Sequence, residues 1–335
     1  MVITIIPSVS NVTTHKLYSC EIDASAVVTH RLYMFAIGPI AVTGLFLNVL
    51  NIFALRRIKS HSNAFFMLRC MAVSDIMYLI VCLVYFPIRH VYLLVVSGDE
   101  VYKRNDWFLG TEILFVVDPL YHLFLIVRNW IVVVVTTERL LNIVAPLWAK
   151  TAITRFRLKL VIGFIFLVAF SYRIENYFTR KLVRGINECT GESTLFIRAP
   201  PGRNEIFHRI YVSMVVVVPQ CVIYIANVIL IVSLRKSAQK RLKMAGSDQV
   251  SHINSQRQAI IIVLAMSTVF TICETPACID RFLNFGSIEL ATSLTRVLRS
   301  ASLVLNILDS TMNFFAYCAS SRPFRQSLIQ MTRKK

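Results

Sequence analysis

The side chains most able to do chemistry are ionisable groups set within long apolar stretches. Arg128 and Asn129 interrupt the stretch "FLIVRNWIVVVVTTERLL", which starts at residue 124. Carboxylates interrupt other apolar stretches: Asp75, Glu274 and Asp309. A charged group at the middle of a bilayer costs at least ~2.5–3.5 kcal/mol, so it faces the protein interior and finds a partner there. This pattern allows three kinds of chemistry: ion pairing, an ion or proton relay, and binding of a charged ligand.

The composition indicates a membrane protein. Hydrophobic residues make up 56% of the 335 residues and charged residues 16%, whereas soluble domains carry about 25% charged residues. The net charge of +18 does not indicate nucleic-acid binding, because the basic residues mostly lie in short gaps between apolar runs. We therefore expect the lipid bilayer, and no nucleic acid, as a partner.

The sequence carries no signature of catalysis. It has no GxSxG, HExxH or phosphate-binding glycine motif, and its 7 histidines are dispersed. The 8 cysteines form no CxxC pair, which argues against a zinc or redox centre. We expect no enzyme, no catalytic residue, no metal and no cofactor.

Seven segments are long and apolar enough to cross the hydrocarbon core, which takes roughly 20 residues. The third and fifth are rich in valine and isoleucine, but their length favours helix over strand. The predicted spans are 32–55, 64–94, 111–143, 157–174, 206–234, 258–283 and 295–318. The sequence thus predicts an all-α membrane protein, a seven-transmembrane helix bundle.

The distribution of lysine and arginine predicts the orientation. Basic residues dominate the gaps after spans one, three and five and the C-terminal tail, opposed there by a single acid, Asp248. Because cytoplasmic loops carry the excess of Lys and Arg, the N-terminus is predicted outside, at the plasma membrane. The chain then divides into an extracellular segment 1–31, a membrane domain 32–320 and a cytoplasmic tail 321–335. Asn11 begins an Asn-Val-Thr glycosylation signal on the outer side.

The tail "SSRPFRQSLIQMTRKK" has apolar residues at helical spacing among its bases: Phe324, Leu328 and Ile329. This pattern predicts a short amphipathic helix on the anionic inner leaflet. The alternative is a disordered basic tail.

Short motifs follow one another along the spans in a fixed order. They are "GLFLNVL" with Asn48, "MAVSDIM" with Asp75, "WFLG", "ERLLNIVAPL", Pro219, "FTICETPA", "NFFAY" and "SSRPFR". Over about residues 32–331 the chain resembles the rhodopsin-like G-protein-coupled receptors. "CETPA" and "NFFAY" are most similar to invertebrate FMRFamide-type neuropeptide receptors, and nematode chemosensory receptors share part of the pattern.

The chain departs from that family at several positions. Leu114 stands where the family has a cysteine at the top of span three, so the usual bridge to the second outer loop cannot form. Glu274 stands where most members have tryptophan, and Leu140 replaces the usual aromatic residue after Arg139.

Three charges are expected at similar depth inside the bundle. Counted from the inner ends of their spans at 1.5 Å per residue, Arg128, Asp75 and Asp309 lie roughly 16 to 20 Å deep. In the resembled family the matching positions line a sodium pocket. We predict that Arg128 occupies the sodium volume and bridges the two acids, in a buried polar network that also includes Asn48, Ser310 and Asn313. The alternative is that Arg128 pairs only with backbone carbonyls or water.

The resemblance implies a switch at the inner end of span three. In the family, the acid at Glu138 holds Arg139 at rest, and activation turns the arginine toward the C-terminal helix of a heterotrimeric G protein. Tyr317 of "NFFAY" belongs to the same coupling region. The alternative for Arg139 is an ordinary side chain that snorkels to the membrane surface.

Polar and aromatic residues near the outer mouth are the predicted ligand contacts. They are Asp118, Tyr121, His122, Glu274, Asp280 and Phe282, with Phe285 beside them. FMRFamide-type peptides end in Arg-Phe-amide, so the three acids are candidates for the arginine of the peptide and the aromatic residues for its ring. The alternative for Glu274 is a buried acid hydrogen-bonded to Asn306 or Asn129.

Cys20 and Cys189 fall in polar segments on the predicted outer side. We predict that they form a disulfide that replaces the bridge lost at Leu114, with two unpaired thiols as the alternative.

The function predicted from these features is a receptor for an FMRFamide-like neuropeptide that signals to a G protein. A chemosensory receptor for a small molecule, with the same fold, is the nearer alternative. An ion-coupled transporter is the more distant one, because the buried charges could form a relay. The chain lacks the internal repeat that marks many transporters.

Overall fold

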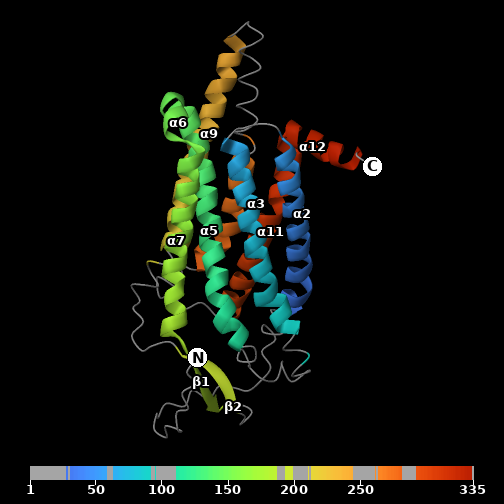
Figure 1. Cartoon of the computed structure of the whole chain (residues 1–335), viewed down its shortest axis with the longest axis vertical. Helices are drawn as coiled ribbons and strands as arrows, with labels where there is room; N and C mark the ends of the chain where they lie inside the picture. Colours follow the sequence, from blue (N-terminus) through green and yellow to red (C-terminus); the bar gives the residue numbers. More distant parts are fainter. Residues whose placement is uncertain are drawn as a thin grey trace.

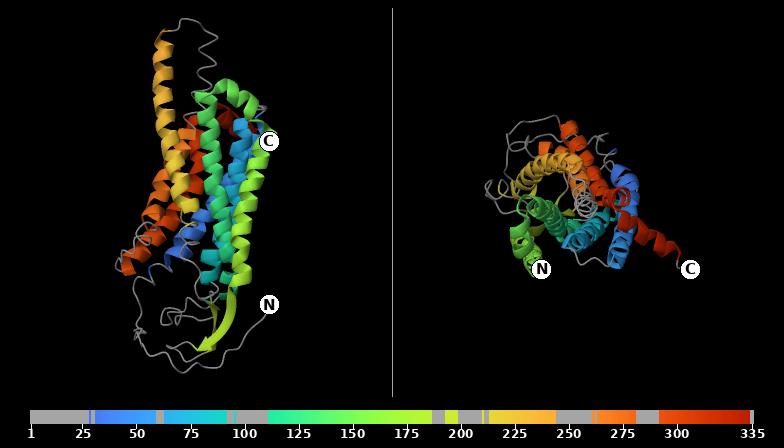
Figure 2. Two further views of the ribbon diagram at one scale, coloured as in Figure 1. Left: turned by 90° about the vertical axis from the view of Figure 1, so that its left-hand side faces the viewer. Right: turned by 90° about the horizontal axis from the view of Figure 1, so that it is seen from above.

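Long helices account for most of the structure. A computed structural model describes residues 31–58, 63–91, 111–186, 193–198, 213–243, 263–280 and 292–333, with Val28, Val95, Ile210 and Ile261. Figure 1 shows the helices running side by side, and Figure 2 shows them gathered into one bundle when seen from above. The long helices are α2 (Gly38–Arg57), α3 (Asn63–Leu83), α5 (Thr111–Val144), α7 (Arg155–Thr179), α9 (Val218–Lys243), α11 (Thr292–Ser320) and the helix Val263–Asp280.

The outer surface of the bundle is apolar enough to face lipid. Among the described residues, five helices are long and apolar enough to cross a membrane: Tyr33–Arg57, Asn63–Val91, Ile113–Val144, Ser213–Ser233 and Val263–Asp280. α7 also turns large apolar side chains outward: Phe156, Phe164 and Leu167 are each more than 60% exposed along it. Soluble proteins rarely expose contiguous apolar surface of this kind.

Short π-helical segments extend three of these helices. Tyr33–Ile37 leads into α2, Val84–Ile88 continues α3, and Ser213–Val217 leads into α9. A proline lies within or just after each of them: Pro39, Pro87 and Pro219. Because proline lacks an N–H donor, a local change of helical geometry lets neighbouring carbonyls find other partners.

The central helices pack closely around α5. α5 contacts α3, α7 and α9, while α2 contacts α3 and α11. Gly44 permits the approach of α2, since a Cβ there would lie 2.5 Å from Thr311 Oγ1 and 2.9 Å from Leu79 Cδ1. Asn48 Nδ2 then donates a 2.8 Å hydrogen bond across this contact to the carbonyl of Ser310.

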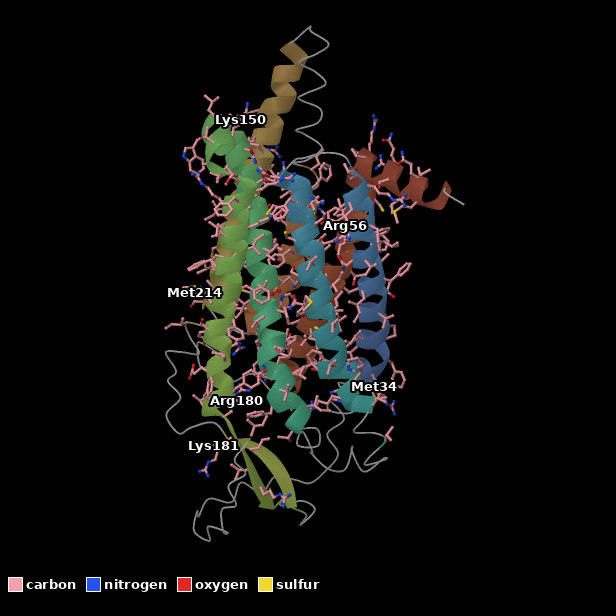
Figure 3. The ribbon with its side chains drawn as sticks, viewed as in Figure 1. Met34, Arg56, Lys150, Arg180, Lys181 and Met214 are labelled. Atoms are coloured by element: carbon pink, nitrogen blue, oxygen red, sulfur yellow. The ribbon has the colours of Figure 1, made fainter. Side chains whose placement is uncertain are left out.

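The two ends of the bundle differ. At the hairpin end, strands β1 (Lys181–Ile186) and β2 (Ser193–Arg198) pair antiparallel, with Lys181 opposite Arg198, and β2 contacts α5. At the tail end lie the short helix α6 (Pro146–Ala152) and helix α12 (Arg322–Arg333). Figure 3 places Arg180 and Lys181 at the hairpin end, and Arg56 and Lys150 at the tail end.

Helix α12 turns away from α11 and lies against α2 (Figure 1). The Ser321 hydroxyl accepts the Phe324 amide at 3.3 Å and caps the new helix. Arg325 donates to the last carbonyls of α11, those of Cys318 and Ala319, at 2.8 and 2.9 Å. These contacts explain why the helix breaks at Ser321, and they support the predicted amphipathic C-terminal helix.

Three features differ from the sequence analysis. The fifth helix was predicted to end near residue 234, but α9 continues to Lys243, because the basic residues beyond the apolar stretch still favour helix. The fourth helix was predicted to end near residue 174, but α7 continues to Thr179 with Arg173 buried. The all-α prediction also omitted the β1–β2 hairpin. The last two lie at the hairpin end, where polar residues sit against protein and hydropathy is a weak guide.

Candidate functional site

One guanidinium and three carboxylates meet inside the bundle. Arg128 on α5 is completely buried, and its Nε lies 3.2 Å from Asp75 Oδ1 on α3. Its Nη2 contacts Asp309 Oδ2 on α11. Its Nη1 lies 3.7 Å from Glu274 Oε1 on the helix Val263–Asp280. We call these four residues the Arg128 cluster; they join four helices that are far apart in the sequence.

Aromatic and amide side chains surround the cluster. The Arg128 Cζ lies 5.3 Å from the ring centre of Tyr78 and 5.7 Å from that of Phe270, within the range of cation–π attraction. Asn313 Nδ2 donates to Asp75 Oδ2 at 2.8 Å. Of the predicted network, Arg128, Asp75, Asp309 and Asn313 are thus in contact, and Asn48 bonds the backbone of Ser310 beside them.

Glu274 has a neighbour in Arg128 that the sequence analysis did not name for it. It was grouped with the acids of the outer mouth, or taken as a partner of Asn129 or Asn306. In the structure it is 1% exposed and faces Arg128. Asn129 Nδ2 instead donates to the Val215 carbonyl at 3.0 Å. The predicted ligand contact of Glu274 and its hydrogen bond to Asn306 stay predictions.

A second group of charges lies at the hairpin end. Asp118 on α5 accepts a 2.7 Å bond from Arg180 Nη1, at the junction of α7 and β1. Asp118 Oδ1 also accepts the Tyr85 hydroxyl at 3.0 Å and lies 3.4 Å from His122 Nε2. Tyr121 stacks on Tyr85 with ring centres 5.1 Å apart. The structure therefore brings Asp118, Tyr121 and His122 together, and adds Tyr85 and Arg180, which the sequence analysis had missed.

Asp280 lies at the end of the helix Val263–Asp280. Asp280 Oδ2 lies 3.4 Å from Arg299 Nε, with the Asp280 side chain 13% exposed. Phe282 and Phe285 lie outside the described residues, as do Cys20, Cys189 and Asn11. The predicted disulfide and glycosylation site therefore stay predictions.

Each of the three candidate acids is adjacent to an arginine of the chain itself. The Asp118 carboxylate lies beside Arg180, the Glu274 carboxylate beside Arg128, and the Asp280 carboxylate beside Arg299. A ligand cation that bound one of these acids would have to displace or share an internal arginine. Arg180 is the more accessible of the first two, at 21% side-chain exposure against 0% for Arg128.

At the tail end, Arg139 Nε lies 3.1 Å from Glu138 Oε2 on the same helix. Asn142 Nδ2 donates to Glu138 Oε1 at 2.7 Å. Tyr317 is buried and packs edge-on against Phe324 of α12, with ring centres 5.5 Å apart. Arg139 thus sits close to its acid, and Tyr317 connects α11 to α12.

Comparison with known proteins agrees with this arrangement. The model of the 7 transmembrane receptor (rhodopsin family) matches residues 46–317. The chain is similar to two Caenorhabditis elegans proteins named as G-protein coupled receptors. F59B2.13 is 25% identical over 99% of this chain and 80% of its own length, and B0563.6 is 20% identical over 92% and 71%. It is also 19% identical to the sex peptide receptor of Drosophila melanogaster, over 60% of this chain and 51% of that receptor.

The family match covers most of the chain, from within α2 to within α11. α7 and α11 lie within this match, so they cross the membrane along with the other five long helices. The buried charges, the apolar exterior and the family match lead to one conclusion: this chain is a seven-transmembrane receptor of the rhodopsin family.

Proposed function

We propose that the chain is a plasma-membrane receptor for an amidated neuropeptide of the FMRFamide type, with its N-terminus and the β1–β2 hairpin outside. The basic gaps at the tail end support this orientation, since cytoplasmic loops carry the excess of Lys and Arg. The segment 1–31, with Asn11 and Cys20, is then extracellular, and 321–335 is the cytoplasmic tail. In this orientation Cys189 belongs to the second outer loop, on the same side of the membrane as Cys20. A disulfide between the two remains part of the proposal.

The Asp118–Arg180 contact carries the proposal for the ligand. Asp118 lies beside an aromatic group, Tyr85 and Tyr121, and already accepts a guanidinium. A peptide that ends in Arg-Phe-amide offers a second guanidinium for Asp118 and a ring for the tyrosines. Displacement of Arg180 would also release the start of the hairpin from α5. The sex peptide receptor, to which this chain is similar, is named for a peptide, and this supports a peptide as the ligand.

Signal transfer to a heterotrimeric G protein belongs to the other end. Glu138 and Arg139 form a bistable ion pair at the tail end, where outward movement of the helix Val263–Asp280 would expose Arg139. The Arg128 cluster lies between the two ends and contacts that same helix through Glu274. A ligand-driven shift of the helix therefore changes the contacts of Arg128 before it reaches Arg139.

Peptide-stimulated nucleotide exchange tests the ligand class. RF-amide peptides would be added to membranes holding the receptor and a G protein, in parallel with peptides in which citrulline replaces arginine. We expect exchange with arginine and little with citrulline, and we expect Asp118→Asn to abolish that difference. Asp280→Asn is the matched control, because Asp280 faces Arg299 instead.

Two outcomes would count against the proposal. Equal responses to arginine and citrulline peptides would reject an acid contact at Asp118. A response to small molecules with none to peptides would support the chemosensory alternative instead.

A further inference from the structure

The Arg128 cluster holds more acids than bases. Arg128 supplies one guanidinium, while Asp75, Glu274 and Asp309 supply three carboxylates. Each of these side chains is at most 2% exposed, so water does not screen the difference. With all four groups ionised, the cluster would carry two negative charges in excess inside the bundle. Buried charge of this kind is costly unless it is paired, and a proton bound to one carboxylate would reduce the excess.

The other titratable groups that face the cluster, in the described part of the chain, do not offset this excess. They are phenols and thiols, which are neutral near physiological pH. They are Tyr78 and Cys82 of α3, Tyr121 of α5 beside Tyr78, Cys273 of the helix Val263–Asp280, and Tyr317 of α11. The neighbouring α2 contributes the amide of Asn48, which does not titrate.

The three acids differ in how closely they contact the guanidinium. Asp75 and Asp309 each accept a hydrogen bond from Arg128, and Asp75 accepts a second bond from Asn313. The Glu274 Oε1 atom lies 3.7 Å from Arg128 Nη1, beyond hydrogen-bond distance. As an anion, Glu274 therefore gains the least from Arg128. A proton on Glu274 also leaves the bonds of Arg128 to both aspartates intact.

We propose that the Arg128 cluster is a proton-binding site and that Glu274 holds the proton in the resting receptor. A proton suits this site because it needs no room of its own, whereas a metal ion would compete with the guanidinium for space. With Glu274 neutral, the charge of Arg128 is shared between Asp75 and Asp309 alone.

The proton changes how the helix Val263–Asp280 is held. An ionised Glu274 is attracted to Arg128 on α5, and movement of its helix would separate the two charges in a medium of low dielectric constant. A protonated Glu274 lacks this attraction, so the helix moves more easily. This consequence rests on the proposed function, in which the same movement exposes Arg139, but the binding of the proton does not.

Thermal unfolding of the unliganded receptor tests whether a proton is bound. The Tm would be measured in detergent between about pH 5 and about pH 8. Over this range an unfolded chain has released the glutamate proton that the folded receptor keeps, so the wild-type Tm should fall as the pH rises. Each pH unit lowers the ratio of folded to unfolded receptor about tenfold, until the folded receptor also loses the proton. Glu274→Gln is neutral at every pH and should lose most of this slope.

Glu175→Gln is the matched control. It makes the same chemical change at a half-buried acid of α7, outside the Arg128 cluster. We expect the Tm of this variant to depend on pH as that of the wild type does.

Infrared spectra identify the group that holds the proton. A protonated carboxyl group has a carbonyl stretching band that an ionised carboxylate lacks. At neutral pH we expect this band from the wild type and from Glu175→Gln, and we expect the Glu274→Gln spectrum to lack it.

Two results would overturn the inference. A wild-type Tm with the same pH dependence as Glu274→Gln, and no protonated carboxyl band, would overturn the proton site. A band that persists in Glu274→Gln would overturn the assignment to Glu274. Because no peptide or G protein is present, these outcomes are independent of the proposed function.

Discussion

Arg128 Nε lies 3.2 Å from Asp75 Oδ1, and both side chains are fully shielded by the bundle. The same guanidinium contacts Asp309 and lies 3.7 Å from Glu274. One positive group therefore faces three acids, each on a different helix. The receptor carries its own cation at the position where the resemblance to its family implied a sodium ion.

Loss of Arg128 should damage folding, whereas loss of Glu274 should not. Arg128→Gln leaves the acids facing one another without a cation, at a cost of about 3–5 kcal/mol. Glu274→Gln keeps the shape of the side chain and removes one negative charge from a cluster in which three carboxylates face one guanidinium. We expect a clearly lower Tm in detergent for the first variant and an equal or higher Tm for the second. A Glu274→Gln receptor as unstable as Arg128→Gln would show that all three acids are needed to hold the arginine.

The Asp118–Arg180 contact should anchor the hairpin in place of the disulfide that Leu114 excludes. Arg180→Ala and Asp118→Asn should each increase hydrogen exchange in β1 and β2, and the double variant should add little. Because both side chains are partly exposed, we expect a coupling energy of only about 1 kcal/mol. Arg184→Ala, on the exposed face of β1, is the control. Fully additive effects would mean that the two residues stabilise the hairpin separately.

Arg139 should be needed for coupling but not for ligand binding. Arg139→Ala is expected to abolish ligand-stimulated nucleotide exchange while leaving radioligand affinity close to that of the wild type. Glu138→Gln weakens the resting contact and should raise exchange without ligand. Arg139→Lys keeps the charge but loses the planar fork, so partial activity is expected. Normal signalling from Arg139→Ala would rule out the switch.

Phe324 should hold α12 against the bundle. Its side chain is completely buried and contacts both Tyr317 and Phe314. Phe324→Ala leaves a cavity and costs about 3–5 kcal/mol where the side chain is packed on all sides. We expect loss of hydrogen-exchange protection throughout α12. Ile329→Ala, at 49% exposure on the same helix, should change little, and equal effects of the two changes would contradict this packing.

Apolar runs and helix depth were enough to predict much of the bundle. Long hydrophobic stretches mark helices because a membrane offers their backbone no other partners. The depth of Arg128, Asp75 and Asp309 placed them at one level, and the cost of buried charge implied that they meet. The structure brings these three into contact.

Rotation about each helix axis could not be predicted in the same way. The contact between Glu274 and Arg128 was not predicted, because the direction of the Glu274 side chain depends on how its helix packs against α5. Arg180 was overlooked because it follows α7, whose end was predicted too early. The β1–β2 pairing depends on contacts with α5 that no local pattern reveals.

The effect of sodium on thermal stability tests the role of Arg128 most directly. The Tm of the unliganded receptor would be measured in sodium chloride and in choline chloride at equal ionic strength. If Arg128 fills the sodium volume, the wild-type Tm should be the same in both salts. Arg128→Ser, which restores a small polar residue there, should gain a Tm that rises with sodium, as binding to the folded state requires. A wild-type Tm that rises with sodium would show that the ion still binds beside Asp75, and would contradict the role proposed for Arg128.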